Sequence, residues 1–381
     1  MEKKILILGG AGFIGSALTK RLSQEGHAVR VLDSLEIQIH GSDEKRKRTA
    51  EYLKSFADFQ LGDIRSRSDV ITALEGIEHV IHLAAETGTG QSMYQLGKYF
   101  DTNVQGTANL LECIANLPKS ARPKSIIVAS SRAIYGEGAY FCEEHGVVYP
   151  RSRSFNDLQK KLYSPRCPQC QAATSPIATA ESAPPNCVSM YGLTKYTQEQ
   201  MCLLQGAALD IPVLACRLQN VYGPGQSLNN PYTGIISIFT SRILNDNPIL
   251  IFEDGHPERD FVFVDDVVDV FSLALKQGWF GCEVINVGTG KPSTVIEVAR
   301  LLQKLLAKST QVEINGEFRT GDIRSNFADS AKLKNMFGIE YLTPLEQGLE
   351  RFVRWAINEE KPIDCFDNSI AELRERGLMR I

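Results

Sequence analysis

An apolar segment that runs straight into a glycine-rich turn is the feature that most restricts how this chain can fold. Lys4–Leu8 has the pattern of a buried parallel strand. The turn after it places glycines three residues apart, at Gly9, Gly12 and Gly15, and Phe13–Glu25 has the period of an amphipathic helix. A strand, a tight turn and a helix in this order predict the first unit of a parallel α/β sheet.

The same alternation continues along the chain. We expect strands over 28–32, 59–61, 79–83 and 125–129, with helices over 69–74 and 103–115 between them. This pattern predicts an α/β fold, a Rossmann-type doubly wound parallel sheet. At 381 residues the chain exceeds one ordinary core, so a smaller, interleaved C-terminal substrate-binding lobe is expected, with helices near 231–244 and 295–305.

The expected domains follow from where the alternation stops and resumes. Residues 140–185 carry four cysteines, several prolines and little apolar periodicity, which indicates an insertion. The charged C-terminal residues are interpreted as a peripheral tail. The predicted division is a Rossmann domain over 1–219 containing the insertion 140–185, a substrate-binding lobe over 220–261 and 291–357, a return to the Rossmann domain over 262–290, and a tail over 358–381.

Composition excludes several classes of protein. The formal net charge of −4 gives no overall basic field for a nucleic acid backbone. No segment approaches the ~20 apolar residues of a membrane helix, and Ile5–Leu8 is too short for the core of a signal peptide. Nine cysteines, odd in number and thinly spread, do not suit a secreted disulfide scaffold. We expect a cytoplasmic protein that binds neither nucleic acid nor membrane.

The glycine turn and a later acidic residue together predict NAD binding. Glycines allow a pyrophosphate to approach the backbone, and the N-terminus of the following helix offers free N–H groups. Asp33 ends the second expected strand, where a carboxylate accepts from both ribose hydroxyls and repels a 2′-phosphate, so NAD is favoured over NADP. The basic run Lys45–Arg48 could favour NADP but is interpreted as a solvated helix face. Asp63 and Ile64, after the third strand, are placed to meet the adenine.

Three further residues form a candidate catalytic set. Tyr191 and Lys195 are four residues apart, so on a helix the phenol and the ammonium share one face. Ser131, at the end of an expected strand, supplies a hydroxyl. Each feature occurs often by chance, but in combination with an N-terminal dinucleotide turn they indicate a catalytic site much more strongly than any one of them alone.

These motifs resemble those of the extended short-chain dehydrogenase/reductases, the family that contains NAD-dependent nucleotide-sugar epimerases and dehydratases. The resemblance implies that Tyr191 is the general base and acid, that Ser131 stabilises the reacting oxygen, and that Lys195 lowers the pKa of the phenol and holds the nicotinamide ribose. It covers Lys3 to Trp355 and rests on Gly9–Gly15, His82–Ala85, Asn103–Gly106, Ser131, Tyr191 with Lys195, Arg217–Gly225, Arg259–Phe261, Asp265–Val267 and Asn286–Gly290. The implied cofactor-binding residues are Gly9, Gly12, Phe13, Ile14, Gly15, Asp33, Asp63, Ile64, Leu83, Ala84, Ala85, Asn103, Tyr191 and Lys195.

The resemblance also narrows the reaction. Dehydratases of the family carry an acidic pair directly after the serine, whereas this chain has Arg132 and Ala133, so a 4,6-dehydratase is not expected. What remains resembles hexose 4-epimerases, in which C4 is transiently oxidised and then reduced on its other face. A net NAD-dependent nucleotide-sugar dehydrogenase or reductase is the alternative, and a non-enzymatic dinucleotide sensor is a third.

The substrate-binding residues implied by the resemblance are Ser131, Asn220, Arg259 and Arg319, with the arginines on the diphosphate and the role of Arg324 left open. Phe239 and Phe252 are expected to pack in the core. The segments 130–138, 90–94 and 230–234 most resemble dTDP-L-rhamnose 4-epimerase-type members, which would convert dTDP-L-rhamnose to dTDP-6-deoxy-L-talose. A UDP-hexose 4-epimerase is the alternative. The resemblance also implies a homodimer through two helices, one of them carrying Tyr191.

The insertion contains a pattern typical of a metal site. Cys142 and His145 form one short pair and Cys167 and Cys170 a second, a spacing that can place four ligands around tetrahedral zinc. Four protein ligands leave no open position, so a structural zinc is predicted and a catalytic one is not. Free surface thiols are the alternative, and Cys187 is a possible substitute ligand. Four other cysteines are expected in core packing: Cys113, Cys202, Cys216 and Cys282.

Overall fold

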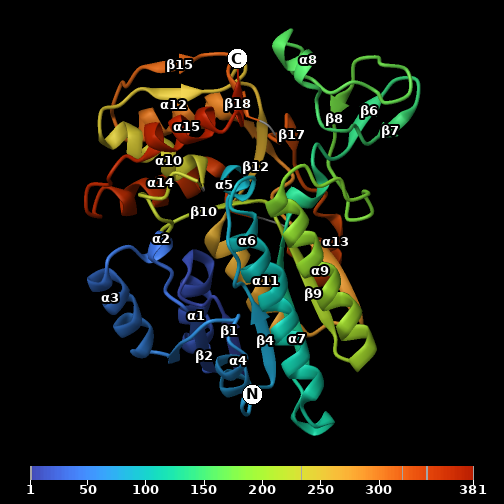
Figure 1. Cartoon of the computed structure of the whole chain (residues 1–381), viewed down its shortest axis with the longest axis vertical. Helices are drawn as coiled ribbons and strands as arrows, with labels where there is room; N and C mark the ends of the chain where they lie inside the picture. The colour runs from blue at the N-terminus through green and yellow to red at the C-terminus, as the bar shows by residue number, and fades with distance from the viewer. Residues whose placement is uncertain (1, 233, 320, 340–341, 381) are drawn as a thin grey trace.

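The computed structural model describes residues 2–232, 234–319, 321–339 and 342–380. One lobe is built on a parallel sheet and contains the N-terminus, and a second lobe lies above it in Figure 1. No helix in the described part of the chain is long and apolar enough to cross a membrane.

The central sheet has seven parallel strands in the order β13-β9-β5-β4-β1-β2-β3. The order reverses between β1 and β4, which is where ligands bind in doubly wound sheets. The expected Rossmann-type fold is therefore confirmed, with boundaries within two residues of those predicted for the first five strands. The strands are β1 (Lys4–Leu8), β2 (Ala28–Asp33), β3 (Asp58–Leu61), β4 (His79–His82), β5 (Ser125–Ser131), β9 (Val213–Leu218) and β13 (Cys282–Val287).

Helices cover both faces of this sheet, because side chains of one strand alternate between two cores. In β1, Ile5 and Ile7 enter one core and Leu6 and Leu8 the other. The first core is closed by α1 (Phe13–Gln24), α3 (Asp43–Lys54), α11 (Val264–Gln277) and α13 (Ala331–Phe337), and the second by α4 (Arg67–Leu74), α7 (Gly106–Asn116) and α9 (Met190–Leu209). Cys113, Cys202, Cys216 and Cys282 pack in these cores, as expected.

The second lobe has its own apolar core and several small sheets. Phe239 is buried in that core, and Phe252 stacks on Phe366, so both aromatic rings serve packing as expected. Its helices are α10 (Ile235–Leu244), α12 (Val295–Leu305), α14 (Leu345–Ala356) and α15 (Phe366–Glu375). Its strands are β10 (Asn220–Tyr222), β11 (Ile249–Ile251), β12 (Glu258–Phe263), β14 (Pro292–Thr294), β15 (Val312–Ile314), β16 (Phe318–Arg319), β17 (Ser325–Asn326) and β18 (Met379–Arg380).

Two of the expected domain assignments are wrong. The segment 358–381 is not a peripheral tail: α15 buries Ile370 and Leu373, and β18 pairs with β16. The apolar residues of α15 are few and lie among many charged ones, so the sequence pattern did not predict its buried face. Helix α13 lies within the predicted second lobe but packs on α11 and β13 of the Rossmann domain, where Leu333 and Phe337 enter the first core. Within 262–290, β13 is an edge strand of the central sheet and α11 packs on α1.

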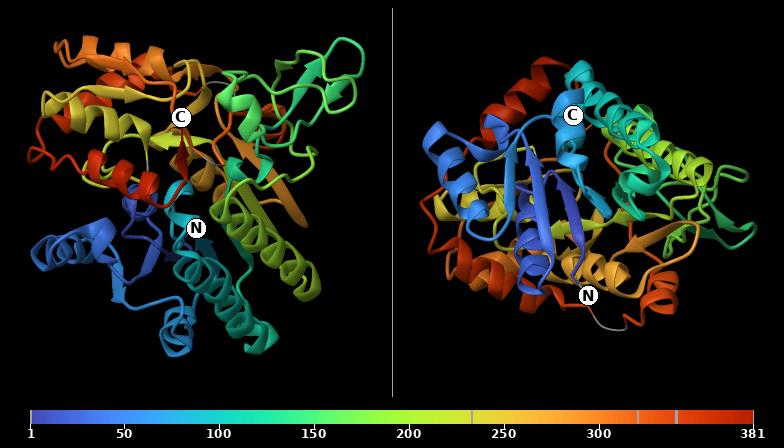
Figure 2. Two further views of the ribbon diagram at one scale, coloured as in Figure 1. Left: turned by 45° about the horizontal axis from the view of Figure 1, so that its top comes forward. Right: turned by 90° about the horizontal axis from the view of Figure 1, so that it is seen from below.

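The predicted insertion forms a small three-stranded sheet of its own. Its order is β7-β6-β8, and it projects beside the second lobe at the upper right of Figure 1. Figure 2 shows it from two further directions, at the side of the molecule. Its elements are β6 (Tyr140–Cys142), β7 (Gly146–Val148), α8 (Phe155–Gln159) and β8 (Ser175–Pro176).

Candidate active site

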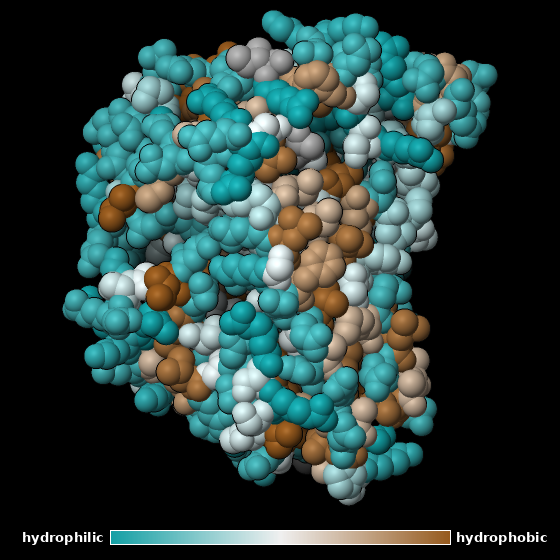
Figure 3. All heavy atoms as spheres, in the orientation of Figure 1, coloured by the Kyte–Doolittle hydropathy of each residue, from teal (hydrophilic) through white to brown (hydrophobic). Residues whose placement is uncertain are grey.

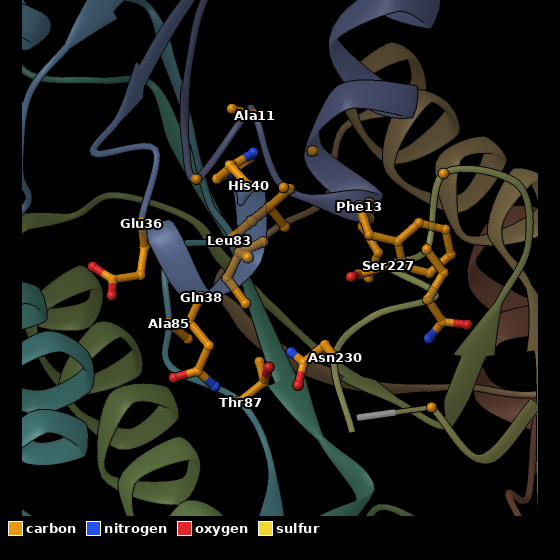
Figure 4. Close-up of a pocket in the computed structure, with 18 of the residues that line it drawn as sticks. Ala11, Phe13, Glu36, Gln38, His40, Leu83, Ala85, Thr87, Ser227 and Asn230 are labelled. Carbon is orange, nitrogen blue, oxygen red and sulfur yellow. The ribbon is translucent and has the colours of Figure 1, made fainter. Parts of the chain in front are cut away.

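A cavity of about 1050 Å³ lies at the carboxyl ends of the central strands, between the two lobes. It is lined by the turns after β1, β2, β4 and β5, and by residues of the second lobe such as Trp355. In Figure 4, Gln38, Thr87 and Asn230 approach the same space from three separate segments. Every predicted cofactor-binding residue lines the cavity except Asn103.

The glycine turn after β1 is tight enough to exclude side chains. A Cβ at Gly15 would lie 2.2 Å from the carbonyl oxygen of Gly9, which itself has a φ of +77°. Gly12 precedes α1 without giving it a side-chain cap, so the first N–H groups of that helix remain open toward the cavity. These features fit a dinucleotide pyrophosphate.

Asp33, at the end of β2, is held in place by two backbone groups. Its carboxylate accepts from the N–H of Ala11 at 2.9 Å and from that of Leu35 at 2.8 Å. His40 lies 3.8 Å away and also lines the cavity, and the sequence analysis did not single it out. Burial lowers the pKa of His40, which favours the neutral imidazole.

The basic run over 45–48 lies on an exposed face of a helix at the rim of the cavity. It lies on α3, and Lys45 and Arg48 contribute to the cavity wall. Both are already paired, Lys45 with Glu360 at 2.9 Å and Arg48 with Glu44 at 2.6 Å. Both side chains remain exposed, so the interpretation of the run as a solvated helix face is confirmed, although this face borders the cavity.

The three predicted catalytic residues meet on one wall of the cavity. Ser131 is the last residue of β5, and Tyr191 and Lys195 lie on the first turns of α9, which Ser189 caps. Burial raises the pKa of Tyr191, while a hydrogen bond with Ser131 and the charge of Arg132 lower it. Lys195 is buried, and burial lowers its pKa to about 8.

A buried chain of polar groups, which the sequence analysis missed, holds Lys195. Its ammonium donates to the side-chain oxygen of Gln198 at 2.5 Å, and the amide nitrogen of Gln198 lies 2.8 Å from His82. Burial lowers the pKa of His82 to about 3, so the imidazole is neutral. Gln198 lies three residues after Lys195, and this helical spacing could have predicted that the two side chains meet.

Asn103 does not reach the cavity and acts on its wall instead. Its side-chain oxygen accepts from the N–H of Glu86 at 2.7 Å, and its amide donates to the hydroxyl of Thr194 at 2.9 Å. It therefore ties the loop after β4 to the catalytic helix. A direct contact of Asn103 with the cofactor stays a prediction.

The predicted substrate residues divide into two groups. Ser131 and Asn220 line the cavity. Arg259 and Arg319 do not, because both guanidinium groups bind the carboxylate of Asp322, at 2.8 Å and 2.9 Å. The two arginines hold the pKa of Asp322 far below its ordinary value. Binding of a diphosphate by Arg259 and Arg319 stays a prediction. It would require both guanidinium groups to release Asp322.

The four predicted metal ligands converge in the insertion. Cys142, His145, Cys167 and Cys170 offer ligand atoms that all lie within 4.8 Å of one another. The sulfur of Cys142 is 3.7 Å from that of Cys170, too far for a disulfide. Cys187 lies elsewhere, with its sulfur 3.7 Å from the carbonyl of Ile134, and is not a fifth member.

The model of one protein family, described as the NAD dependent epimerase/dehydratase family, matches residues 5–154 and 162–288. The chain belongs to this family. The match includes residues 140–154 and 162–185 of the predicted insertion and omits residues 155–161.

Similar proteins are known within the epimerase/dehydratase family. The chain is 33% identical over 359 residues to a dTDP-L-rhamnose 4-epimerase from Burkholderia thailandensis, covering 94% of this chain and 96% of the relative. It superposes with a TM-score of 0.72 on a UDP-glucose 4-epimerase with UDP-glucose from Thermotoga maritima, at 29% identity, covering 92% and 98% of the two chains. The TM-score is also 0.72 with MoeE5 in complex with UDP-glucuronic acid and NAD, at 28% identity and the same coverage.

Proposed function

We propose that this member of the family is an NAD-dependent nucleotide-sugar 4-epimerase. The observation that carries the proposal is that Ser131, Tyr191 and Lys195 line the same cavity as the glycine turn and Asp33. Proton transfer and dinucleotide binding are thereby brought to one space, which a sensor or scaffold does not need. The similarity to 4-epimerases over more than nine-tenths of the chain supports the reaction class.

Tyr191, Ser131 and Lys195 have different roles in the proposed proton transfer. Bound NAD would supply a hydride acceptor and donor at C4 and would end each cycle unchanged. Tyr191 removes the proton of the C4 hydroxyl and later returns it, while Ser131 donates a hydrogen bond to the same oxygen. Lys195, buried nearby, favours the phenolate form of Tyr191. The 4-keto sugar turns between the two half-reactions, so that hydride returns to the opposite face.

For the substrate we propose a dTDP-6-deoxyhexose, with dTDP-L-rhamnose converted to dTDP-6-deoxy-L-talose. Support comes from the relative in Burkholderia thailandensis and from the segments 90–94, 130–138 and 230–234 of this chain. UDP-hexoses, including uronates, are the alternative, favoured by the solved structures that hold UDP-sugars.

The test is NMR of dTDP-L-rhamnose, UDP-glucose and UDP-glucuronate, each incubated with the purified protein without added cofactor. We expect the 4-epimer to form from dTDP-L-rhamnose, and Tyr191→Phe to lower the rate about 10²–10⁴-fold. Conversion only with stoichiometric added NAD(H) would identify a net dehydrogenase or reductase. Conversion of a UDP-sugar alone would reject the dTDP-sugar.

We also propose that the insertion binds one structural zinc ion. With Zn–S of about 2.3 Å and Zn–N of about 2.0–2.1 Å, the edges of a tetrahedral site are roughly 3.5–3.8 Å long. The Cys142–Cys170 distance is 3.7 Å, and Nδ1 of His145 lies 3.7 Å from Cys142 and 3.6 Å from Cys167. The four ligands form an almost closed shell, so the metal would stabilise the β6–β7–β8 sheet and take no part in catalysis.

Elemental analysis of protein purified without added metal tests this site. We expect about one zinc per chain, loss of the metal in Cys167→Ser, and full retention in Cys187→Ser, which changes a cysteine outside the cluster. Wild-type protein without stoichiometric metal would leave the cluster as free thiols.

We further propose a homodimer formed through α7 and α9. These helices pack side by side, and α9 exposes Leu193 and Leu204, the latter with 71% of its surface accessible. Figure 3 shows apolar side chains gathered over the part of the molecule where these helices lie in Figure 1. Light scattering after gel filtration should give twice the chain mass, and Leu204→Glu should give the monomer.

A further inference from the structure

The segments that follow β2 and β4 meet across the end of β1. In the central sheet β1 lies between β2 and β4, so these two segments flank the glycine turn on its two sides. The first, 34–41, contains the short helix α2 (Ile37–His40), and the second, 83–92, contains α5 (Thr89–Ser92). Both contribute to the cavity together with the glycine turn. A link between them therefore spans the strand end at which a dinucleotide pyrophosphate would lie.

Gln38 and Gln91 join the two segments through their side-chain amides. The amide nitrogen of Gln38 donates to the side-chain oxygen of Gln91 at 2.8 Å, and the amide nitrogen of Gln91 donates to the side-chain oxygen of Gln38 at 3.1 Å. Gln38 lines the cavity, whereas Gln91 is 3% exposed and does not line it. Gln91 can therefore influence a bound cofactor only through the residues that it holds.

Lys98, on α6 (Leu96–Tyr99), adds an ionic link between the same two segments. Its ammonium lies 3.5 Å from the carboxylate of Glu36, on the first segment, and 3.2 Å from that of Glu86, on the second. It also donates to the side-chain oxygen of Gln38 at 3.3 Å. Like Gln91, Lys98 does not line the cavity.

The second segment has its own anchors in the Rossmann domain, whereas α2 has few. Tyr99, which is fully buried, donates to the carbonyl of Thr87 at 2.6 Å, and the side chain of Asn103 binds both the N–H and the carbonyl of Glu86. None of the four residues of α2 is buried. A segment with so little buried surface can open separately from the core. The bonds to Gln91 and Lys98 are thus what fix α2 to the far side of the glycine turn.

We propose that Gln38, Gln91 and Lys98 form a clasp that closes over bound NAD and retains it from one catalytic cycle to the next. An epimerase regenerates NAD within each cycle and has no need to release it, whereas a net dehydrogenase must exchange it at every turnover. The inference rests on the proposed epimerase activity and adds the means of cofactor retention. Opening the clasp breaks only hydrogen bonds and ion pairs.

Exchange of NAD tests the clasp without any turnover. Protein loaded with radiolabelled NAD is mixed with an excess of unlabelled NAD, and the label that stays bound is followed with time. Because the amide pair comprises two hydrogen bonds, Gln38→Ala and Gln91→Ala should each speed dissociation about tenfold. Lys98→Ala should speed it about two- to fivefold. Gln24→Ala, which removes an exposed glutamine of α1, should leave the rate unchanged.

The double variant distinguishes a clasp from a direct contact between Gln38 and the cofactor. If the two amides act through each other, Gln38→Ala should have no further effect in a Gln91→Ala background. Association should also quicken, so the Kd for NAD should change less than either rate constant. If Gln91→Ala does not fold, as judged by circular dichroism, the two rate constants of Gln38→Ala decide by themselves.

Two results would overturn the clasp. Additive effects, or a raised Kd with unchanged association, would place Gln38 directly on NAD. Wild-type protein that exchanges NAD as fast as the variants would show that the bridge between the segments retains nothing. Retention of NAD without conversion of any nucleotide sugar would instead reject the epimerase function, so the two failures are distinguishable.

Discussion

At the scale of single residues, the catalytic set depends on buried polar side chains whose partners are fixed. Lys195 is held by Gln198, and Gln198 in turn lies against His82 and the carbonyl of Ala84. Lys195, Gln198 and His82 are buried, so the hydrogen bonds among them satisfy polar atoms that are shielded from water. The ammonium of Lys195 therefore has one orientation before any ligand binds.

Gln198→Leu should weaken both stability and activity. It removes the acceptor of a buried ammonium, which costs about 1–3 kcal/mol of unfolding free energy and lowers the pKa of Lys195 further. We expect kcat near neutral pH to fall at least tenfold, with partial recovery in Gln198→Glu. Thermal unfolding and steady-state kinetics measure both effects. Gln200→Leu, on the same helix, is the control, and an equal loss there would contradict a specific role for Gln198.

At the scale of elements, the catalytic residues meet because α9 approaches the 3-10 helix η3 (Arg132–Tyr135) very closely. Gly192, next to Tyr191, makes this possible: a Cβ there would lie 2.6 Å from the carbonyl oxygen of Ala133. Ser189 caps α9 and accepts from the N–H of Gly192 at 3.1 Å, which fixes the start of the helix. The serine of β5 and the tyrosine of α9 are thus brought together by backbone packing.

Gly192→Ala should separate these two elements. The added methyl group must push α9 from η3, at a cost of about 1–3 kcal/mol, and should reduce kcat more than NAD affinity, since the glycine turn is distant in sequence and unaffected. The matched control is Gly97→Ala in helix α6 (Leu96–Tyr99), where no atom lies within 4 Å of the new Cβ. Chemical denaturation measures the loss of stability, and NAD titration measures the cofactor affinity. If Gly192→Ala and Gly97→Ala behaved alike, the close approach of α9 to η3 would not be what positions the catalytic residues.

At the scale of the whole molecule, the C-terminal segment completes the cavity and the second lobe. Residues 359–361 line the cavity, and Glu360 pairs with Lys45 of the Rossmann domain. This exposed pair contributes little to stability. The segment is held instead by the buried face of α15 and by Glu372, which accepts from the hydroxyls of Tyr94 and Tyr232 at 2.9 Å and 2.8 Å.

Leu373→Ala should therefore destabilise the protein by about 2–5 kcal/mol, as expected for a buried leucine. Ile357→Ala, at a position with 58% of its surface exposed, should change the unfolding free energy by less than about 0.5 kcal/mol. Urea denaturation measures both. If Leu373→Ala changed the unfolding free energy only slightly, the C-terminal segment would be peripheral, as the sequence first indicated.

The sequence by itself determined the features that are local in the chain. The strand–turn–helix at the N-terminus, Asp33 at the end of β2, the spacing of Tyr191 and Lys195, and the two short pairs Cys142/His145 and Cys167/Cys170 can all be read from neighbouring residues, because each depends on a few positions of fixed periodicity.

Only the tertiary structure decided which side chains meet across long separations. It placed Arg259 and Arg319 on Asp322 and joined α15 to the second lobe. Charge partners and buried faces of this kind depend on how elements pack. The residue pattern of one segment does not show which other segment will pack against it.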